Sequence, residues 1–464
     1  MIEKNLHQNK IIFSISFLII ANFIFNHEFL FYFYKGEVDF SNFVDHWMLS
    51  QYICSYQLEF AKRCFVGSFF QFFKINVSFK IIYLFNLIVL NFLIILLVYL
   101  INKIESKKII LSLFSLILFS PFFINNFANS IGINEPQIYL FFVLIIFLNL
   151  KNKNELYLTL PLSVMAILTH EISLFIIFPI IFLIKFENCY KNNNFSNLIL
   201  FSTISILTYL LVFIFGEISQ ENANIIYQQV IEIKEQNFNT ALIFLTGIYD
   251  ANHAYVKPTI IRNIINLNIP ILFLYLFLNY LMAYKIFKNY FIFNQNLLSL
   301  IKLFILILMI FILYYFMVSF FDQICEFLFK RNPNGAPLLR EIVLKLSFLL
   351  LLLTFFYITY LYGFKKLINN IYESFDFLLF LCPLIILLTF FVGSAYGRYV
   401  AFTLINLVIL SIYFCIKFDH RKLNLKYFNI IIIFNFIIFL FFHINDEGFS
   451  SNFSKLPVTP LSFE

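Results

Sequence analysis

Long stretches without a charged residue decide what this chain can fold into. Eight such stretches are apolar throughout, and each approaches the roughly 20 residues that cross a lipid bilayer as an α-helix. Backbone N–H and C=O groups must find partners within the segment when it lies in lipid, so each stretch is predicted to be a transmembrane helix. The eight stretches are residues 81–101, 198–216, 264–284, 303–321, 346–364, 377–394, 399–416 and 427–442.

The composition excludes a water-soluble protein. Hydrophobic residues make up 61% of the 464 residues and charged residues only 12%, whereas a soluble domain has about 25% charged residues. The formal net charge of +7 does not indicate nucleic-acid binding, because Lys and Arg lie mainly in loops beside the apolar stretches. We therefore expect an all-α, polytopic integral membrane protein with a single transmembrane domain over residues 1–464.

The N-terminal stretch and four shorter ones complete the predicted topology. Residues 11–26 follow Lys4 and Lys10 without a cleavage signature, which predicts a retained first helix and a cytoplasmic N-terminus. The total is about 13 helices, with 12 and 14 as alternatives, and Lys and Arg are roughly threefold denser in the predicted cytoplasmic segments than outside. Prolines predict that some short stretches are broken, tilted or re-entrant helices. The short stretches are residues 109–125, 137–150, 156–169 and 172–186.

Three large extracytoplasmic loops are expected, at residues 34–80, 217–263 and 322–345. Function is expected in these loops, because loops are free to carry polar chemistry. The first loop contains the aromatic stretch 65–73, which is typical of a helix that lies in the headgroup region. This stretch is also a candidate binding site for a lipid phosphate.

The candidate catalytic residues are carboxylates and a histidine at the predicted outer face. His170 and Glu171 lie between two short apolar stretches with no long loop to solvate them, so the pair is either functional or part of a hydrogen-bonded turn. Asp39 and Asp45 lie in the first outer loop. Each is a candidate general base, with a solvated loop residue as the alternative.

The candidate binding residues lie at the same predicted face. Adjacent Lys62 and Arg63 suit a clamp on the phosphates of an isoprenoid carrier, or a headgroup contact. Arg398, in a turn of small residues, suits a phosphate or a sugar-linked anion, or a headgroup contact. Glu135, beside Pro136, suits a helix N-terminus, where a capping role competes with a binding role.

Signatures of nucleotide-driven enzymes are missing from the sequence. It has no Walker-type phosphate loop and no dinucleotide fingerprint, which disfavours an ATP- or NAD-driven protein. The six cysteines lack zinc spacing, so no metal site and no cofactor is predicted, although a carboxylate in the first outer loop would suit a divalent cation. Cys54 and Cys64 share that loop, which allows a disulfide.

Three motifs resemble elements of bacterial surface-polysaccharide membrane proteins, namely the O-antigen polymerases and the lipid-carrier-dependent glycosyltransferases with multispan folds. The resemblance covers the architecture of nearly the whole chain, although Ala395 stands where an acidic residue is expected before the third motif. It implies a multi-pass protein of the bacterial inner membrane, whose partners are undecaprenyl-linked glycans, membrane lipids and other polysaccharide-assembly proteins. The motifs are Lys62-Arg63-Cys64-Phe65-Val66-Gly67, Thr169-His170-Glu171 and Tyr396-Gly397-Arg398-Tyr399.

The activity that the resemblance implies is polymerisation of lipid-linked repeat units into O-antigen or capsule, a glycosyl transfer at the outer face of the inner membrane. Arg63, Arg340 and Arg398 would hold pyrophosphate. His170 or Glu171 would assist proton transfer to the acceptor hydroxyl.

Two alternatives remain at this point. A glycosyltransferase that uses a polyprenyl-phosphate sugar would place Asp39 or Asp45 as the base, and would add one sugar without changing chain length. A flippase or transporter is disfavoured, because charged residues along the apolar stretches are too sparse to make a polar path.

Overall fold

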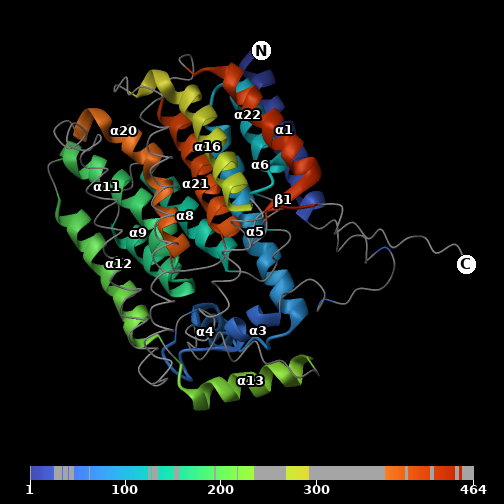
Figure 1. Cartoon of the computed structure of the whole chain (residues 1–464), viewed down its shortest axis with the longest axis vertical. Helices are drawn as coiled ribbons and strands as arrows, with labels where there is room; N and C mark the ends of the chain where they lie inside the picture. The colour runs from blue at the N-terminus through green and yellow to red at the C-terminus, as the bar shows by residue number, and fades with distance from the viewer. Residues whose placement is uncertain are drawn as a thin grey trace, which may run out of the picture.

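In the computed structural model, the described part of the chain is helical apart from one short hairpin (Figure 1). The predicted stretches 303–321 and 346–364 and the predicted loop 322–345 lie outside the described residues. The structure describes residues 2–25, 34, 40, 46–61, 63–123, 127, 134–150, 156–192, 195–216, 218–234, 268–291, 371–391, 396–418, 423–444 and 449–451.

The described elements are mostly α-helices. The α-helices are α1 (Ile2–Phe25), α3 (His46–Ile53), α4 (Phe65–Phe72), α5 (Phe79–Asn102), α6 (Lys107–Phe119), α8 (Glu135–Leu150), α9 (Leu156–Thr169), α10 (Ser173–Ile176), α11 (Phe178–Asn192), α12 (Ser196–Phe215), α13 (Gln220–Lys234), α16 (Asn268–Phe287), α20 (Ile371–Leu381), α21 (Tyr396–Lys417) and α22 (Leu425–Phe441). Two 3₁₀-helices, η2 (Lys288–Tyr290) and η4 (Cys382–Phe391), and an antiparallel pair of strands, β1 (Phe442–Ile444) and β2 (Phe449–Ser451), complete the set.

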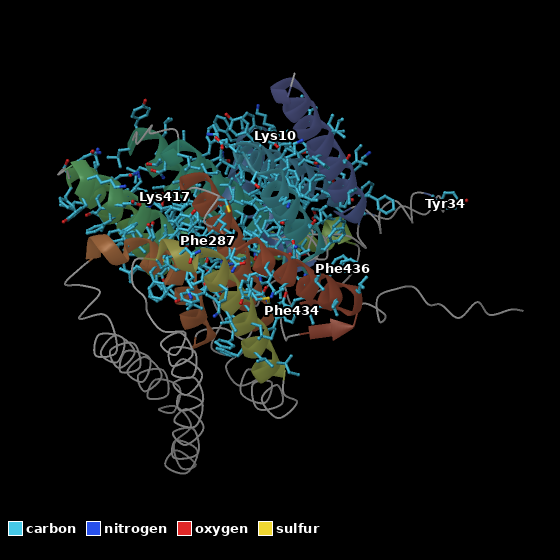
Figure 2. All side chains as sticks on the ribbon, turned by 90° about the horizontal axis from the view of Figure 1, so that it is seen from above. Lys10, Tyr34, Phe287, Lys417, Phe434 and Phe436 are labelled. Atoms are coloured by element: carbon cyan, nitrogen blue, oxygen red, sulfur yellow. A yellow bond between two sulfur atoms is a disulfide. The ribbon has the colours of Figure 1, made fainter. Side chains whose placement is uncertain are left out.

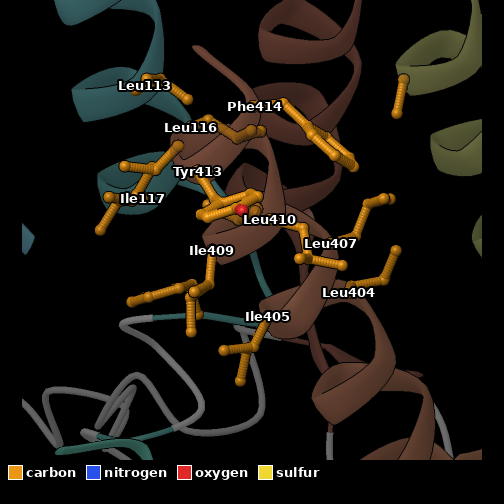
Figure 3. Close-up of a cluster of buried hydrophobic side chains, with 14 of the residues drawn as sticks. Leu113, Leu116, Ile117, Leu404, Ile405, Leu407, Ile409, Leu410, Tyr413 and Phe414 are labelled. Carbon is orange, nitrogen blue, oxygen red and sulfur yellow. The ribbon is translucent and has the colours of Figure 1, made fainter. Parts of the chain in front are cut away.

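Helix α21 forms the centre of the bundle. It packs against α5, α6, α16 and η4, and 89% of its most apolar window, within residues 398–417, is buried. Figure 3 shows the side chains of Leu113 and Leu116 on α6 beside those of α21. By contrast, only 22% of the most apolar window of α12 is buried. Lipid is as apolar as these side chains, so close packing rather than exclusion of water determines which helix lies at the centre. Helix α12 instead presents an apolar face to its surroundings.

Four of the described helices are long and apolar enough to cross a membrane, judged by length and composition. They are Phe79–Asn102, Ser196–Phe215, Ile271–Tyr290 and Arg398–Lys417. Five shorter apolar helices accompany them within the described residues: Lys10–Phe23, Glu135–Leu150, Leu156–Thr169, Phe375–Ile386 and Leu425–Leu440. The all-α class and the membrane-helix composition predicted from the sequence are therefore confirmed.

Proline shapes the short and broken helices. The stretch predicted at 172–186 divides into α10 and α11, and α11 begins one residue before Pro179. The stretch predicted at 377–394 differs from a continuous α-helix, because α20 gives way to the 3₁₀-helix η4 immediately before Pro383. Proline lacks the N–H group and its ring clashes with the carbonyl four residues earlier, which accounts for the change at this point.

Helices α3, α4 and α13 form a cap across one end of the bundle (Figure 1). They come from the first two predicted outer loops and share a hydrophobic cluster with the start of α5, separate from the core of the bundle. Glu59 joins the two loops, since its carboxylate accepts hydrogen bonds from Ser219 N at 2.7 Å and Asn222 Nδ2 at 3.0 Å. The buried residues of the cluster are Leu49, Tyr52, Cys54, Ala61, Cys64, Val66, Phe70, Ile82, Tyr83, Ile218, Ala223, Ile226 and Val230.

Candidate functional site

The cap brings Arg63 to the His170-Glu171 pair. Arg63 lies just before α4, and Glu171 lies in the turn between α9 and α10. Arg63 Nε donates to Glu171 Oε1 at 3.2 Å and to Oε2 at 3.1 Å, and Arg63 Nη2 also donates to Oε1. The side chains are 12% and 24% exposed. The structure thus joins two residues that the sequence predicted separately, 108 positions apart.

The charge of Glu171 is fixed by its neighbours. Burial disfavours the ionised carboxylate, but the positive charge of Arg63 outweighs that cost, with a further contribution from His170, and holds the pKa of Glu171 well below its usual value. A carboxylate held ionised by a guanidinium is a poor general base, because it has little tendency to take a proton near neutral pH. Glu171 is therefore better suited to orient a neighbour than to accept the proton itself.

His170 is the neighbour that Glu171 orients. The Nδ1 atom of His170 lies 3.3 Å from Glu171 Oε2 and 3.2 Å from the backbone N of Ile172. The neutral ring has two tautomers. In one, Nδ1 carries the proton and donates to Glu171, which leaves the lone pair of Nε2 available. In the other, Nδ1 accepts from Ile172 N and Nε2 carries the proton. The same ring is thus placed to hold a proton on either nitrogen, and a carboxylate at Nδ1 favours the tautomer with a basic Nε2.

A second arginine–carboxylate pair joins two helix N-termini. Arg398, in the first turn of α21, forms an ion pair with Glu135, in the first turn of α8, and both side chains are largely buried. The guanidinium carbon of Arg398 also lies 5.8 Å from the centre of the Phe402 ring. Pro136 follows Glu135 in the first turn of α8, as the sequence predicted. Glu135 therefore combines a helix-start position with a direct contact to another site residue.

A buried network of amides and one phenol joins residues next to Glu135 in the sequence to α3 and α5. Asn134 Nδ2 donates to Gln51 Oε1 at 2.7 Å. Asn86 Nδ2 donates to Tyr52 Oη at 2.7 Å, and Gln137 Nε2 donates to Asn86 Oδ1 at 2.9 Å. Sequence reasoning assigned no role to these five residues. Amide side chains at intervals within otherwise apolar helices were the available signal, since an amide buried in a bundle needs a partner.

Both ion pairs lie at the end of the bundle that carries the cap. The network connects α3 to α8 next to Glu135, and the Cys54–Cys64 disulfide connects the end of α3 to the residue after Arg63. Helix α4 packs on α9, and α10 packs on α21. His170, Glu171, Glu135, Arg63 and Arg398 therefore lie at one end of the described bundle, whereas their expected location at the outer membrane face stays a prediction.

No protein-family model, curated protein or solved structure matches the chain. What the site can do therefore rests on its own residues. The other candidates, Lys62, Asp39, Asp45 and Arg340, lie outside the described residues, so the structure does not place them. Among the described residues, no group of three or more His, Cys, Asp and Glu side chains is arranged to hold a metal ion.

A different charged cluster marks the opposite end of the bundle. Lys417, the last residue of α21, donates to Glu187 at 2.8 and 2.9 Å and to Asp376 at 2.7 Å. Lys191 donates to the same Glu187 carboxylate at 2.8 Å. Figure 2, viewed along the bundle, labels Lys417 and Lys10. These contacts join α11, α20 and α21, so the cluster serves to hold helix ends together.

Proposed function

We propose that the protein transfers glycans between undecaprenyl-linked carriers at the outer face of the bacterial inner membrane, polymerising repeat units into a surface polysaccharide. The observation that carries the proposal is the Arg63–Glu171–His170 arrangement, a cation, a fixed carboxylate and a titratable ring under a cap of loop helices. These are the groups that transfer from a pyrophosphate-linked donor to a hydroxyl requires.

His170 acts as the base in this proposal. Its Nε2 takes the proton of the acceptor hydroxyl while Nδ1–H donates to Glu171, and the acceptor oxygen attacks the anomeric carbon of the donor glycan. The bond from that carbon to the pyrophosphate oxygen breaks, and the lipid pyrophosphate leaves with the electron pair. Glu171 stabilises the imidazolium that forms.

Arginine neutralises the leaving group. Glu171 accepts from Nε and Nη2 of Arg63, and the positive charge of Arg63 attracts an anionic leaving group. Arg398 supplies a second cation at the same end of the bundle. Lys62 is proposed as a further binding residue because it is adjacent to Arg63 in the sequence, and Arg340 because of the sequence resemblance.

The membrane arrangement belongs to the same proposal: about 13 spans, a cytoplasmic N-terminus and the cap outside the cell membrane. Two observations support it. The cap holds a disulfide, and disulfides persist in oxidising compartments such as the periplasm. Lys10, Lys191 and Lys417 make their contacts at the end away from the cap, as the positive-inside rule requires of the cytoplasmic side.

One observation favours a second candidate, a glycosyltransferase that uses a polyprenyl-phosphate sugar. Helix α3 begins at His46, directly after Asp45, and leads through Gln51 to the network beside Glu135. Asp45, the residue before α3 in the sequence, is the base in this candidate. This enzyme would add one sugar to each acceptor instead of extending the chain.

A gel profile of the surface polysaccharide tests the proposal. A deletion strain is complemented with wild type, with His170→Ala, with Glu171→Gln and, as a matched control far from the cap, with Glu187→Gln. We expect the deletion and both site variants to reduce the ladder to a core carrying one repeat unit, and Glu187→Gln to restore the ladder. A full ladder with shifted bands supports the single-sugar transferase, and an unchanged profile in the deletion strain overturns both functions.

A further inference from the structure

The disulfide of the cap lies directly beside Arg63. Cys54, which follows α3, is bonded to Cys64, which precedes α4, and both residues are fully buried. Arg63 is thus bonded to one half of the cystine through its own backbone. The cystine fixes where the chain turns from α3 into α4, and this turn carries the guanidinium toward Glu171.

The backbone at Arg63 is held in a conformation that it would not adopt unaided. Its φ of 66° lies in the left-handed region, which residues with a Cβ atom seldom occupy. Such a conformation persists only where the surrounding structure determines it. The strained backbone of Arg63 therefore coincides with a specific contact of its side chain, the ion pair with Glu171.

Close backbone contacts enforce the same turn. A Cβ on Gly67 would lie 1.9 Å from the carbonyl oxygen of Cys54, so only glycine fits where α4 meets the end of α3. Ser68 Oγ accepts from Tyr56 N at 2.8 Å and donates to Cys64 O at 2.7 Å. The cystine, the glycine contact and the serine bridge all fix the segment that contains Arg63.

We infer that the Cys54–Cys64 disulfide is a positioning device for Arg63, coupled thermodynamically to the Arg63–Glu171 ion pair. Reduction by a dithiol breaks the S–S bond, delivers two electrons and two protons to form two thiols, and converts the dithiol to its own disulfide. The chain between residues 54 and 64 then gains freedom, and the left-handed turn at Arg63 loses its support. The role of the device in catalysis rests on the proposed function, but the coupling itself does not.

Reciprocity makes the coupling measurable without an activity assay. If the disulfide favours the ion pair, the ion pair favours the disulfide by the same free energy. Removing the charge of Glu171 should therefore make the disulfide easier to reduce. We expect about a tenfold change in the reduction equilibrium constant, which corresponds to about 30 mV for this two-electron couple.

The experiment titrates the purified full-length protein in detergent with mixtures of reduced and oxidised dithiothreitol. Free thiols are then tagged with a maleimide polymer, and the fraction of molecules carrying two additional tags is read from a gel. Wild type is compared with Glu171→Gln and with Glu187→Gln, which removes an equally ion-paired carboxylate at the opposite end of the bundle. The expected result is a shift for Glu171→Gln and none for Glu187→Gln.

A double-mutant cycle secures the interpretation. Arg63→Ala should shift the equilibrium as Glu171→Gln does, and the double variant should shift it no further, because each change removes the same pair. Equal midpoints for wild type, Glu171→Gln and Arg63→Ala would overturn the inference, as would equal shifts for Glu171→Gln and Glu187→Gln. Failure of the proposed function appears separately, as a normal polysaccharide profile in the deletion strain.

Discussion

Glu171 shows how one residue defines the chemistry around it. A carboxylate placed between apolar helices is expensive to bury, so its presence in the sequence already pointed to a partner or a function. In the structure, Arg63 is the ion-pair partner of Glu171, and His170 is the titratable side chain that contacts the same carboxylate. Removing one member of a buried pair leaves the other charge uncompensated, which costs more than the pair contributes.

The Arg63–Glu171 pair predicts a pH-dependent stability difference. Because the pKa of Glu171 is lowered in the folded protein, its stabilisation is complete above the unfolded-state value of 4.5 and disappears as the pH falls through the lower folded-state value. Glu171→Gln should therefore lower the free energy of unfolding by about 2 kcal/mol at pH 7. Thermal unfolding in detergent should show a constant gap from wild type between pH 8 and about pH 5, narrowing at lower pH.

The exposed carboxylate of Glu232 on α13 provides the control for this titration. Glu232→Gln should unfold as wild type does across the whole range. A gap for Glu171→Gln that stayed constant down to pH 3 would mean that the ionised carboxylate contributes nothing and that the amide disturbs packing instead.

Single residues of the site were predictable, but their pairing was not. Glu171, Arg63, Glu135 and Arg398 each stood out as charges next to apolar stretches. Which arginine meets which carboxylate depends on how segments more than 100 positions apart pack, and local charge patterns contain no such information. Gln137 and its network partners escaped notice, because an amide in an apolar helix looks tolerable until its buried neighbours are known.

At the level of elements, the sequence predicted the existence of a helix well where the composition of the segment alone determines it. Residues 65–73 were expected to form an interfacial helix, and α4 spans Phe65–Phe72 with Phe72 76% exposed. The close approach between α4 and the end of α3 was not predictable, because Gly67 does not show from the sequence which backbone it faces. Likewise, residues 377–394 were predicted to form one transmembrane helix, and the switch to a 3₁₀-helix at Pro383 was not predicted.

Gly67→Ala should therefore damage the cap specifically. The added methyl group would collide with the backbone carbonyls of Cys54 and Tyr52, and separating α4 from α3 should cost about 3 kcal/mol. Hydrogen exchange should speed up in α3 and α4 but not in α21. Gly216→Ala is the matched control, because Gly216 ends α12 with a φ of −84°, which alanine adopts freely. Equal exchange in the two variants would contradict the close contact at Gly67.

The molecule as a whole has two chemically different ends. The cap end carries the disulfide and both arginine–glutamate pairs, while the other end carries the lysine cluster around Glu187. Helix α21 connects them, since Arg398 lies near its start and Lys417 at its end, roughly 30 Å apart at 1.5 Å per residue. That distance matches the hydrocarbon thickness of a bilayer, so the two ends are expected to face opposite sides of the membrane.

Labelling of introduced cysteines in whole cells checks this arrangement. Gln229→Cys places an exposed thiol on α13 of the cap, and Lys191→Cys places one beside the lysine cluster. A membrane-impermeant maleimide should label Gln229→Cys in intact spheroplasts, and should label Lys191→Cys only after the membrane is opened, because the proposed topology places the cap outside and the lysines in the cytoplasm. The unmodified protein gives the background from its native cysteines. Labelling of both variants in intact spheroplasts would place the two ends on the same side of the membrane. The reverse pattern would place the cap and its arginines in the cytoplasm, where they could not take part in a periplasmic transfer reaction.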